Sequence, residues 1–201
     1  MQKDLTAELK QAAAIIKSGG VVAFPTDTVY GLGALADNPE AVRRVFEIKG
    51  RPLSQALPLL VINITQAMDT ASRVSETAKI LMARFWPGAL TLVFPRATWV
   101  SDMVTAGGST VAVRVPNHPL TIELIKAAGG PLVGTSANLH GYLSPVTAEE
   151  VREQLGNSVD LIIDGGRAPG GVESTIVDVS IHPPRILRQG MIKREDIEVL
   201  W

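Results

Sequence analysis

The sequence has no cysteine and few histidines, and both facts limit the metal sites and nucleophiles that the protein can have. Without cysteine, disulfide bonds, thiolate metal sites and a thiol nucleophile are excluded. The histidines are His118, His140 and His182, and no two of them have the i, i+4 spacing of a helical metal site. We therefore expect no metal ion to be held by protein side chains.

The sequence also lacks an excess of charge of one sign and long apolar runs. The formal net charge is −1, so the whole chain has no attraction for nucleic acid and any basic site must be local. No apolar run approaches the ~18 residues of a membrane span. The first residues carry acids among their apolar positions, which is typical of a helix and not of a signal peptide. We predict a soluble, cytoplasmic protein with no membrane partner.

The length and composition are those of a globular α/β protein. The 201 residues are 46 % hydrophobic and 19 % charged, and no linker or repeat divides them, so we predict a single domain over 1–201. Periodicity and capping residues predict helices over 5–16, 39–49, 65–71 and 75–85, and one from 148. Strand patterns occupy 21–26, 57–62, 89–95, 110–116, 131–136, 160–164, 174–180 and 185–189. Because several late strands follow one another without a helix, we expect a mixed sheet with helices on its faces.

Two polar stretches in the first half are unusual for connecting loops. "PTDTVYGLG" (25–33) combines Thr26, Asp27 and Thr28 with two glycines, which permit close approach of a ligand to the backbone. A tight strand-to-helix turn is the alternative. "KGRP" (49–52) places Lys49 and Arg51 at a helix end, where both could reach one anion. As an alternative to anion binding, Lys49 could simply interact with the negative end of the helix dipole, but this does not account for Arg51.

A cation also lies within the strand 110–116. Arg114 shares a strand face with Thr110 and Ala112, so a guanidinium and a hydroxyl point in the same direction. The alternative is a surface arginine on an edge strand.

The second half of the sequence contains small polar residues and one further cation that could belong to the same site. Thr135, Ser136, Asn138 and Ser144 follow a buried strand and suit either a polar ligand or turn formation. Ser174 and Thr175 open a strand, and Arg188 lies on the next one. No serine–histidine–acid set and no pair of acids stands out. The pattern indicates binding of an anionic nucleotide and a polar substrate, with catalysis by positioning and electrostatic stabilisation.

Six motifs in order carry a family resemblance. "PTDTVYGLG", "KGRP", "TVAVRVPNHP", "TSAN", "GVESTIVD" and "ILRQG" together resemble the YrdC-like threonylcarbamoyl-AMP synthases, from about Gly19 to Gly190. Because the chain ends at Trp201, it resembles the short single-domain form. The resemblance implies a twisted mixed α/β sheet with helices on its faces and a large concave, positively lined cavity.

The resemblance also implies a nucleotidyltransferase, L-threonylcarbamoyladenylate synthase. L-threonine, bicarbonate and ATP, assisted by Mg²⁺, would give threonylcarbamoyl-AMP and pyrophosphate. The product would pass to the threonylcarbamoyl-transfer machinery that makes t⁶A at position 37 of tRNA.

The resemblance assigns roles to individual residues. Lys49 and Arg51 would be catalytic and face the ATP phosphates. The threonine-binding residues implied are Thr28, Leu60, Arg114, Gly134 and Ser174. The ATP-binding residues implied are Lys49, Arg51, Gln55, Thr110, Ser136, Asn138, Ser144 and Arg188. Many relatives carry asparagine and histidine at the positions of Gln55 and Leu60; Gln55 keeps the amide group, whereas Leu60 cannot hydrogen-bond.

Two other functions stay open. A paralogue that binds tRNA or double-stranded RNA should leave a basic surface and aromatic platforms, which a net charge of −1 and 4 % aromatics do not favour. A paralogue that acts on a different carbamoyl compound would be consistent with Leu60. We expect the glycine-rich 165–172 segment to be mobile and to close over the intermediate.

Overall fold

A computed structural model of the chain describes residues 2–201, with side chains from residue 6 onward. The helices are α1 (Gln2–Lys17), α2 (Pro39–Lys49), α3 (Ile64–Asp69), α4 (Glu76–Phe85), α5 (Asp102–Thr105), α6 (Pro119–Ala128), α7 (Ala148–Leu155) and α8 (Arg194–Glu198), with a 3-10 turn at Gly156–Ser158. The strands are β1 (Val22–Phe24), β2 (Gly31–Leu35), β3 (Leu59–Leu60), β4 (Leu90–Pro95), β5 (Thr110–Arg114), β6 (Leu132–Ser136), β7 (Leu161–Ile162), β8 (Thr175–Asp178) and β9 (Arg185–Arg188).

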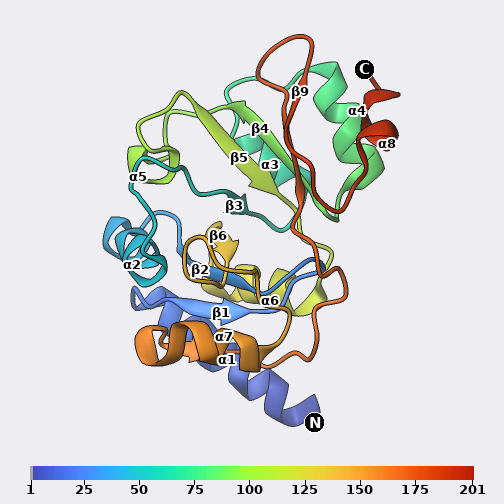
Figure 1. Cartoon of the computed structure of the whole chain (residues 1–201). Coiled ribbons are helices and arrows are strands. Elements are labelled where there is room, and N and C mark those ends of the chain that lie inside the picture. The colour runs from blue at the N-terminus through green and yellow to red at the C-terminus, as the bar shows by residue number, and fades with distance from the viewer. Residues whose placement is uncertain (1) are drawn as a thin grey trace.

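The described strands form a nine-stranded mixed sheet, as the sequence predicts. Its order is β7-β1-β2-β6-β3-β5-β4-β8-β9. The pairs β1/β7, β3/β5 and β4/β8 are parallel, and the other neighbours are antiparallel. Figure 1 shows β1, β2 and β6 in one half of the molecule and β4, β5 and β9 in the other, with β3 between them. The two halves of the sheet therefore meet where β6, β3 and β5 run side by side.

Apolar side chains on both sides of the strands give the sheet a core on each face. Val22 and Phe24 of β1 pack with α1 and α6 in one cluster, whereas Val21 and Ala23 belong to a cluster with α2, α4 and α7. Successive side chains of a strand point to opposite faces, so both faces are covered by helices. The predicted stripe of the first helix is confirmed at its buried positions 12, 13 and 16, while the side chain of Leu5 lies outside those described.

Helix starts follow the predicted capping chemistry. The Asn38 side chain accepts a hydrogen bond from the Ala41 N–H at the start of α2, and Pro39 takes the first turn. The Thr147 side chain accepts from the Glu150 N–H at the start of α7. These local signals place two helices next to the loops that carry the polar motifs.

Strand β2 and helices α5, α6 and α8 differ from the sequence-based expectation. The 25–33 stretch, interpreted as a connecting loop, ends in strand β2, which lies between β1 and β6. Glycine is a weak strand former, but a Cβ on Gly33 would lie 2.6 Å from the Val133 carbonyl oxygen and 2.9 Å from the Phe24 ring, so only glycine fits there. Helix α6 was not predicted, although Leu120, Leu124 and Ala128 have helical spacing. None of the described helices is long and apolar enough to cross a membrane.

Candidate active site

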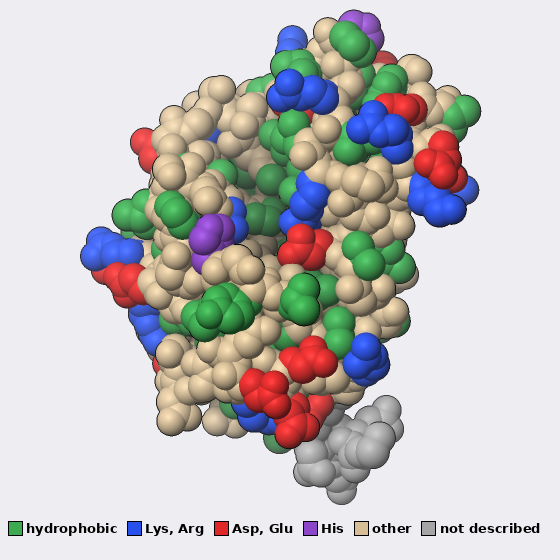
Figure 2. Space-filling view, viewed as in Figure 1, with side chains coloured by type: hydrophobic (Ala, Val, Ile, Leu, Met, Phe, Trp, Pro, Cys, Tyr) green, Lys and Arg blue, Asp and Glu red, His purple; other side chains and the backbone are tan. Residues whose placement is uncertain are grey.

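A cavity of about 390 Å³ opens where the two halves of the sheet meet. Figure 2 shows this face hollowed near its middle, with basic side chains and an acidic one at the edge of the hollow. Most of the predicted site residues line the cavity. These are Thr28, Lys49, Arg51, Leu60, Arg114, Gly134, Ser136, Asn138, Ser174 and Arg188.

Three predicted residues lie elsewhere. Ser144 lines a neighbouring cavity, and Gln55 and Thr110 line neither of the two. Thr110 pairs with Pro95 at the opposite end of β5 from Arg114. The two are four residue steps apart along the strand, about 13 Å, so sharing a face does not bring them into one site.

Arg114 is a buried cation of the site. Its side chain is 8 % exposed and forms an ion pair with Asp27, with Nη2 and Oδ1 2.7 Å apart. Its Nη1 donates to the Thr28 hydroxyl at 2.9 Å and its Nε to the Gly88 carbonyl at 2.9 Å. Asp27 also accepts from the Asn117 N–H. A guanidinium has five N–H donors, so one N–H on each terminal nitrogen remains for a ligand.

Lys49 lies at the end of α2 and is 2 % exposed. Its ammonium donates to the carbonyl oxygens of Ser136 and Asn138 and to the Asn138 side-chain oxygen. The Lys49 carbonyl accepts in turn from the His140 N–H at 2.7 Å. An ammonium has three donors, and all of them are used here. In this conformation Lys49 therefore holds the end of β6 and the loop after it, and it can act on a ligand only through its charge.

Burial lowers the pKa of Lys49 from 10.5 to about 8; the nearby Arg51 lowers it too, and Glu173 opposes them. Below pH 8 both folded and unfolded chains carry the ammonium. Between pH 8 and 10.5 the unfolded chain still binds a proton that the folded chain has released, so the free energy of unfolding rises with pH. We expect a rise on the order of 3 kcal/mol from this group, measured by urea unfolding across that range.

Lys49→Met is the matched variant, because it keeps an unbranched side chain but cannot titrate. Its unfolding free energy should lack this rise. Tyr30, whose pKa is raised by burial, titrates in both proteins and cancels in the difference. The same pH dependence in wild type and variant would contradict the assignment.

Arg51 follows the left-handed residue that ends α2. Gly50 has φ 61°, which turns the chain so that Arg51 enters the cavity. Among the described residues, its guanidinium donates to two carbonyl oxygens of its own loop, those of Gln55 at 3.3 Å and Ala56 at 3.0 Å. Burial and the nearby Arg188 lower its pKa, and Glu173 opposes them. Its remaining donors are available to an anion.

Arg188 reaches the cavity from β9. It forms an ion pair with Glu173, and its Nη2 donates to the Ser174 carbonyl at 2.9 Å. The Ser174 hydroxyl is 2.8 Å from that of Thr91. Glu173 also accepts from the Ser144 hydroxyl at 2.6 Å. Burial raises the pKa of Glu173, but the Ser144 hydrogen bond and the Arg188 charge outweigh it and hold the pKa below its ordinary value.

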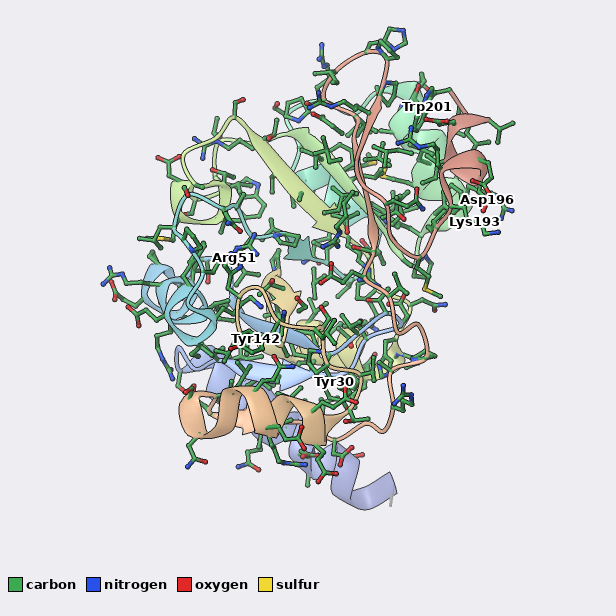
Figure 3. All side chains as sticks on the ribbon, in the orientation of Figure 1. Tyr30, Arg51, Tyr142, Lys193, Asp196 and Trp201 are labelled. Atoms are coloured by element: carbon green, nitrogen blue, oxygen red, sulfur yellow. The ribbon has the colours of Figure 1, made fainter. Side chains whose placement is uncertain are left out.

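The 165–172 segment, expected to be mobile, is tied to the loop before β2. The Tyr30 hydroxyl donates to the Gly166 carbonyl at 2.7 Å, and the Gly171 N–H donates to the Thr28 carbonyl at 2.9 Å. A Cβ on Gly170 would lie 2.8 Å from the Thr28 Cα. Tyr30 is labelled in Figure 3, with Arg51 and Tyr142, which also line the cavity. The segment thus helps to position Thr28 in this conformation.

Leu60 supplies apolar surface to the cavity. It lies on β3 between β5 and β6, and it is 5 % exposed. A Cβ on Gly134 would lie 2.5 Å from the Leu60 side chain, so the two positions are packed in direct contact. Leu60 therefore fills space against Gly134 and offers no hydrogen bond to a substrate.

Sequence reasoning missed two charged residues of the site. Asp27 and Glu173 stand inside quoted motifs, but no role was assigned to either. Their partners are distant in the chain, Arg114 for Asp27 and Arg188 for Glu173. The only signal in the sequence was an acid placed between small residues in a polar loop. Among the residues that the structure describes, no group of three or more His, Cys, Asp or Glu side chains could hold a metal ion.

The mixed α/β sheet thus carries one cavity lined by cations, hydroxyls and a glycine, a lining that suits small anionic molecules. The chain belongs to the Sua5, YciO and YrdC family, because the family model described as "Telomere recombination" matches residues 14–190.

Similar proteins share both sequence and fold with this chain. The threonylcarbamoyl-AMP synthase of Bacillus subtilis is 46 % identical over 96 % of this chain and 56 % of its own length. That of Vibrio vulnificus is 38 % identical over 92 % of this chain and 100 % of its own length. The crystal structure of Pyrococcus abyssi Sua5 complexed with L-threonine has a TM-score of 0.93 and 43 % identity, over 96 % of this chain and 56 % of that one. The chain thus spans about half the length of the Bacillus and Pyrococcus proteins.

Proposed function

We propose that this chain makes L-threonylcarbamoyl-AMP and pyrophosphate from L-threonine, bicarbonate and ATP. The observation that carries the proposal is the convergence of Arg51, Arg114 and Arg188 on one cavity together with the hydroxyls of Thr28 and Ser174. The names of the Bacillus and Vibrio relatives and the threonine complex of Pyrococcus Sua5 support it. A positively charged cavity suits the reaction because two anionic substrates must be held close together.

Arg114 would bind the threonine carboxylate. One N–H on each of its terminal nitrogens is unused, and a carboxylate accepts such a pair in parallel. Asp27 and Gly88 hold the guanidinium in place, so that it need not reorganise on binding. Thr28 and Ser174 would contact the rest of the amino acid, and the Leu60–Gly134 contact would form an apolar wall beside it.

Arg51 and Arg188 would bind the phosphates. The threonine amine attacks CO₂, or bicarbonate with loss of water, to give a carbamate. A carbamate oxygen then attacks the α-phosphorus of ATP and pyrophosphate leaves. The charge on the phosphate oxygens grows toward the leaving group, where fixed guanidinium groups stabilise it.

Magnesium would arrive with the nucleotide. The cavity's carboxylate, Glu173, is already paired with Arg188 and Ser144. The side chains therefore fit an ion carried by the triphosphate and not one held in a protein cage. When bound, Mg²⁺ would neutralise phosphate charge. The proposal places the reaction in the cytoplasm, where the product would pass to the machinery that modifies adenosine 37 of tRNA.

The test is pyrophosphate release from ATP and Mg²⁺, with threonine and bicarbonate omitted in turn. Release that requires both substrates is the expected result. Pyrophosphate release that does not depend on threonine would contradict the proposal and indicate that the protein acts on another carbamoyl compound. A salt-dependent affinity for tRNA without ATP turnover would instead identify an RNA-binding protein.

A further inference from the structure

Among the described residues that line the cavity, Glu173 carries the only carboxylate. Its side chain accepts from Ser144 at 2.6 Å and forms an ion pair with Arg188. The charge of Glu173 also acts on Lys49 and Arg51, because it opposes the lowering of both pKa values. An acid thus occupies the part of the cavity where cations converge.

The partners of Glu173 are groups that an incoming phosphate would use. Arg188 and Ser144 come from segments far apart in the sequence, and both are held by this one carboxylate. A phosphate and a carboxylate both accept hydrogen bonds from guanidinium and hydroxyl groups, so they compete for the same donors. They also repel each other, so Glu173 and a bound phosphate cannot share this position without cost.

Glu173 also separates two cavities. It lines the 390 Å³ cavity and a neighbouring one of about 620 Å³, whose wall includes Ser144, Gln154 and Val172. The smaller cavity lies near the lower end of the ~300–1,000 Å³ range of small-molecule sites. The proposed reaction requires a nucleotide and an amino acid at once. Glu173 therefore belongs to the wall of both cavities.

Only the side chain of Glu173 needs to move for its carboxylate to leave Arg188 and Ser144. Its carbonyl accepts from the Met191 N–H at 2.9 Å, and a Cβ on Gly190 would lie 2.3 Å from that carbonyl oxygen, so the backbone is tightly held. The side chain is 32 % exposed, which leaves room for rotation toward solvent. A change of side-chain rotamer is therefore sufficient.

We propose that Glu173 is an internal anion that occupies the phosphate side of the cavity, and that the phosphates of the nucleotide displace it from Arg188 and Ser144. This inference rests on the proposed function and adds a residue that sets nucleotide affinity. The contact keeps the cations paired and ordered in the free protein. It also weakens binding of every phosphate-bearing ligand.

The test is isothermal titration of ATP, AMP and adenosine into wild type, Glu173→Gln and Glu149→Gln. The substituted glutamine side chain would retain the shape and a hydrogen-bonding oxygen but not the charge. We expect Glu173→Gln to bind ATP about tenfold more tightly, AMP less so, and adenosine unchanged. Glu149 is exposed on α7 and outside both cavities, so Glu149→Gln, with the same loss of charge, should match wild type for all three ligands.

The ligand series separates charge competition from a structural role. Weaker ATP binding by Glu173→Gln, unchanged binding, or an equal gain for adenosine would each overturn the inference. If the wild type releases pyrophosphate in a threonine-dependent reaction but Glu173→Gln does not bind ATP more tightly, the inference is refuted and the proposed function stands. Wild type that neither binds ATP nor releases pyrophosphate would refute the proposed function, and the inference with it.

Discussion

Arg114→Ala is expected to lower kcat/KM for threonine by at least about 100-fold, because it removes the proposed partner of the substrate carboxylate from a buried site. It should also destabilise the protein by about 3–5 kcal/mol, since Asp27, whose side chain is 12 % exposed, loses its cation. Urea unfolding and threonine-dependent pyrophosphate release measure the two effects.

A second substitution separates stability from activity. Asp27→Asn combined with Arg114→Ala removes the unpaired carboxylate, so part of the lost stability should return while the activity should not. Arg96→Ala provides a matched control, because Arg96 is a partly buried arginine that pairs with Asp102 and lies outside the cavity. It should leave kcat/KM for threonine unchanged. Recovery of activity in the double variant would show that Arg114 acts only on the fold.

Arg51→Ala is expected to lower the rate of pyrophosphate release by about 10²- to 10³-fold, the usual effect of removing one charge-stabilising donor from an active site. The free energy of unfolding should change by no more than about 1 kcal/mol, because the hydrogen bonds of this side chain to the described residues are those to the Gln55 and Ala56 carbonyls. Initial rates over a range of ATP concentrations measure the effect. A large loss of stability with little loss of rate would argue against a role in phosphate binding.

Arg43→Ala is the control for Arg51→Ala. Arg43 lies on the helix that precedes Arg51, is exposed, and pairs with Glu40, so the net charge changes equally. Its rate should match that of wild type. Equal losses in both variants would indicate a general effect of charge on nucleotide approach and not a contact at Arg51.

Local patterns predicted most of the fold correctly. Alternation along β5 placed Val111 and Val113 in the core and left Arg114 for the other face, which is what the structure shows. The helix starts at Asn38 and Thr147 followed from side-chain capping. Strand β2 was missed because its glycines have low strand propensity, and the pairing with β1 and β6 that overrides this propensity is not local.

The candidate site was predictable as a set of motifs but not as a set of contacts. The motifs drew attention to Lys49, Arg51 and Arg114, and the cavity contains all three. The same reasoning grouped Thr110 with Arg114 because they share a strand face, although only Arg114 lies at the cavity end of β5. A strand pattern identifies the face of a residue, but the neighbouring strands and loops decide what that residue meets.

The sequence by itself determined the periodicities, the caps and the kinds of chemical group available, because each depends on residues only a few positions apart. The fold sets three features that local patterns do not give: the pairing of Asp27 with Arg114, the use of all three Lys49 donors by the end of β6 and the loop after it, and the position of Glu173 against Arg188. These contacts depend on the order of strands in the sheet, which brings together loops that are distant in sequence. The Asp27–Arg114 pair is buried, so water screens the attraction between its charges less than it screens the more exposed pair of Glu173 and Arg188.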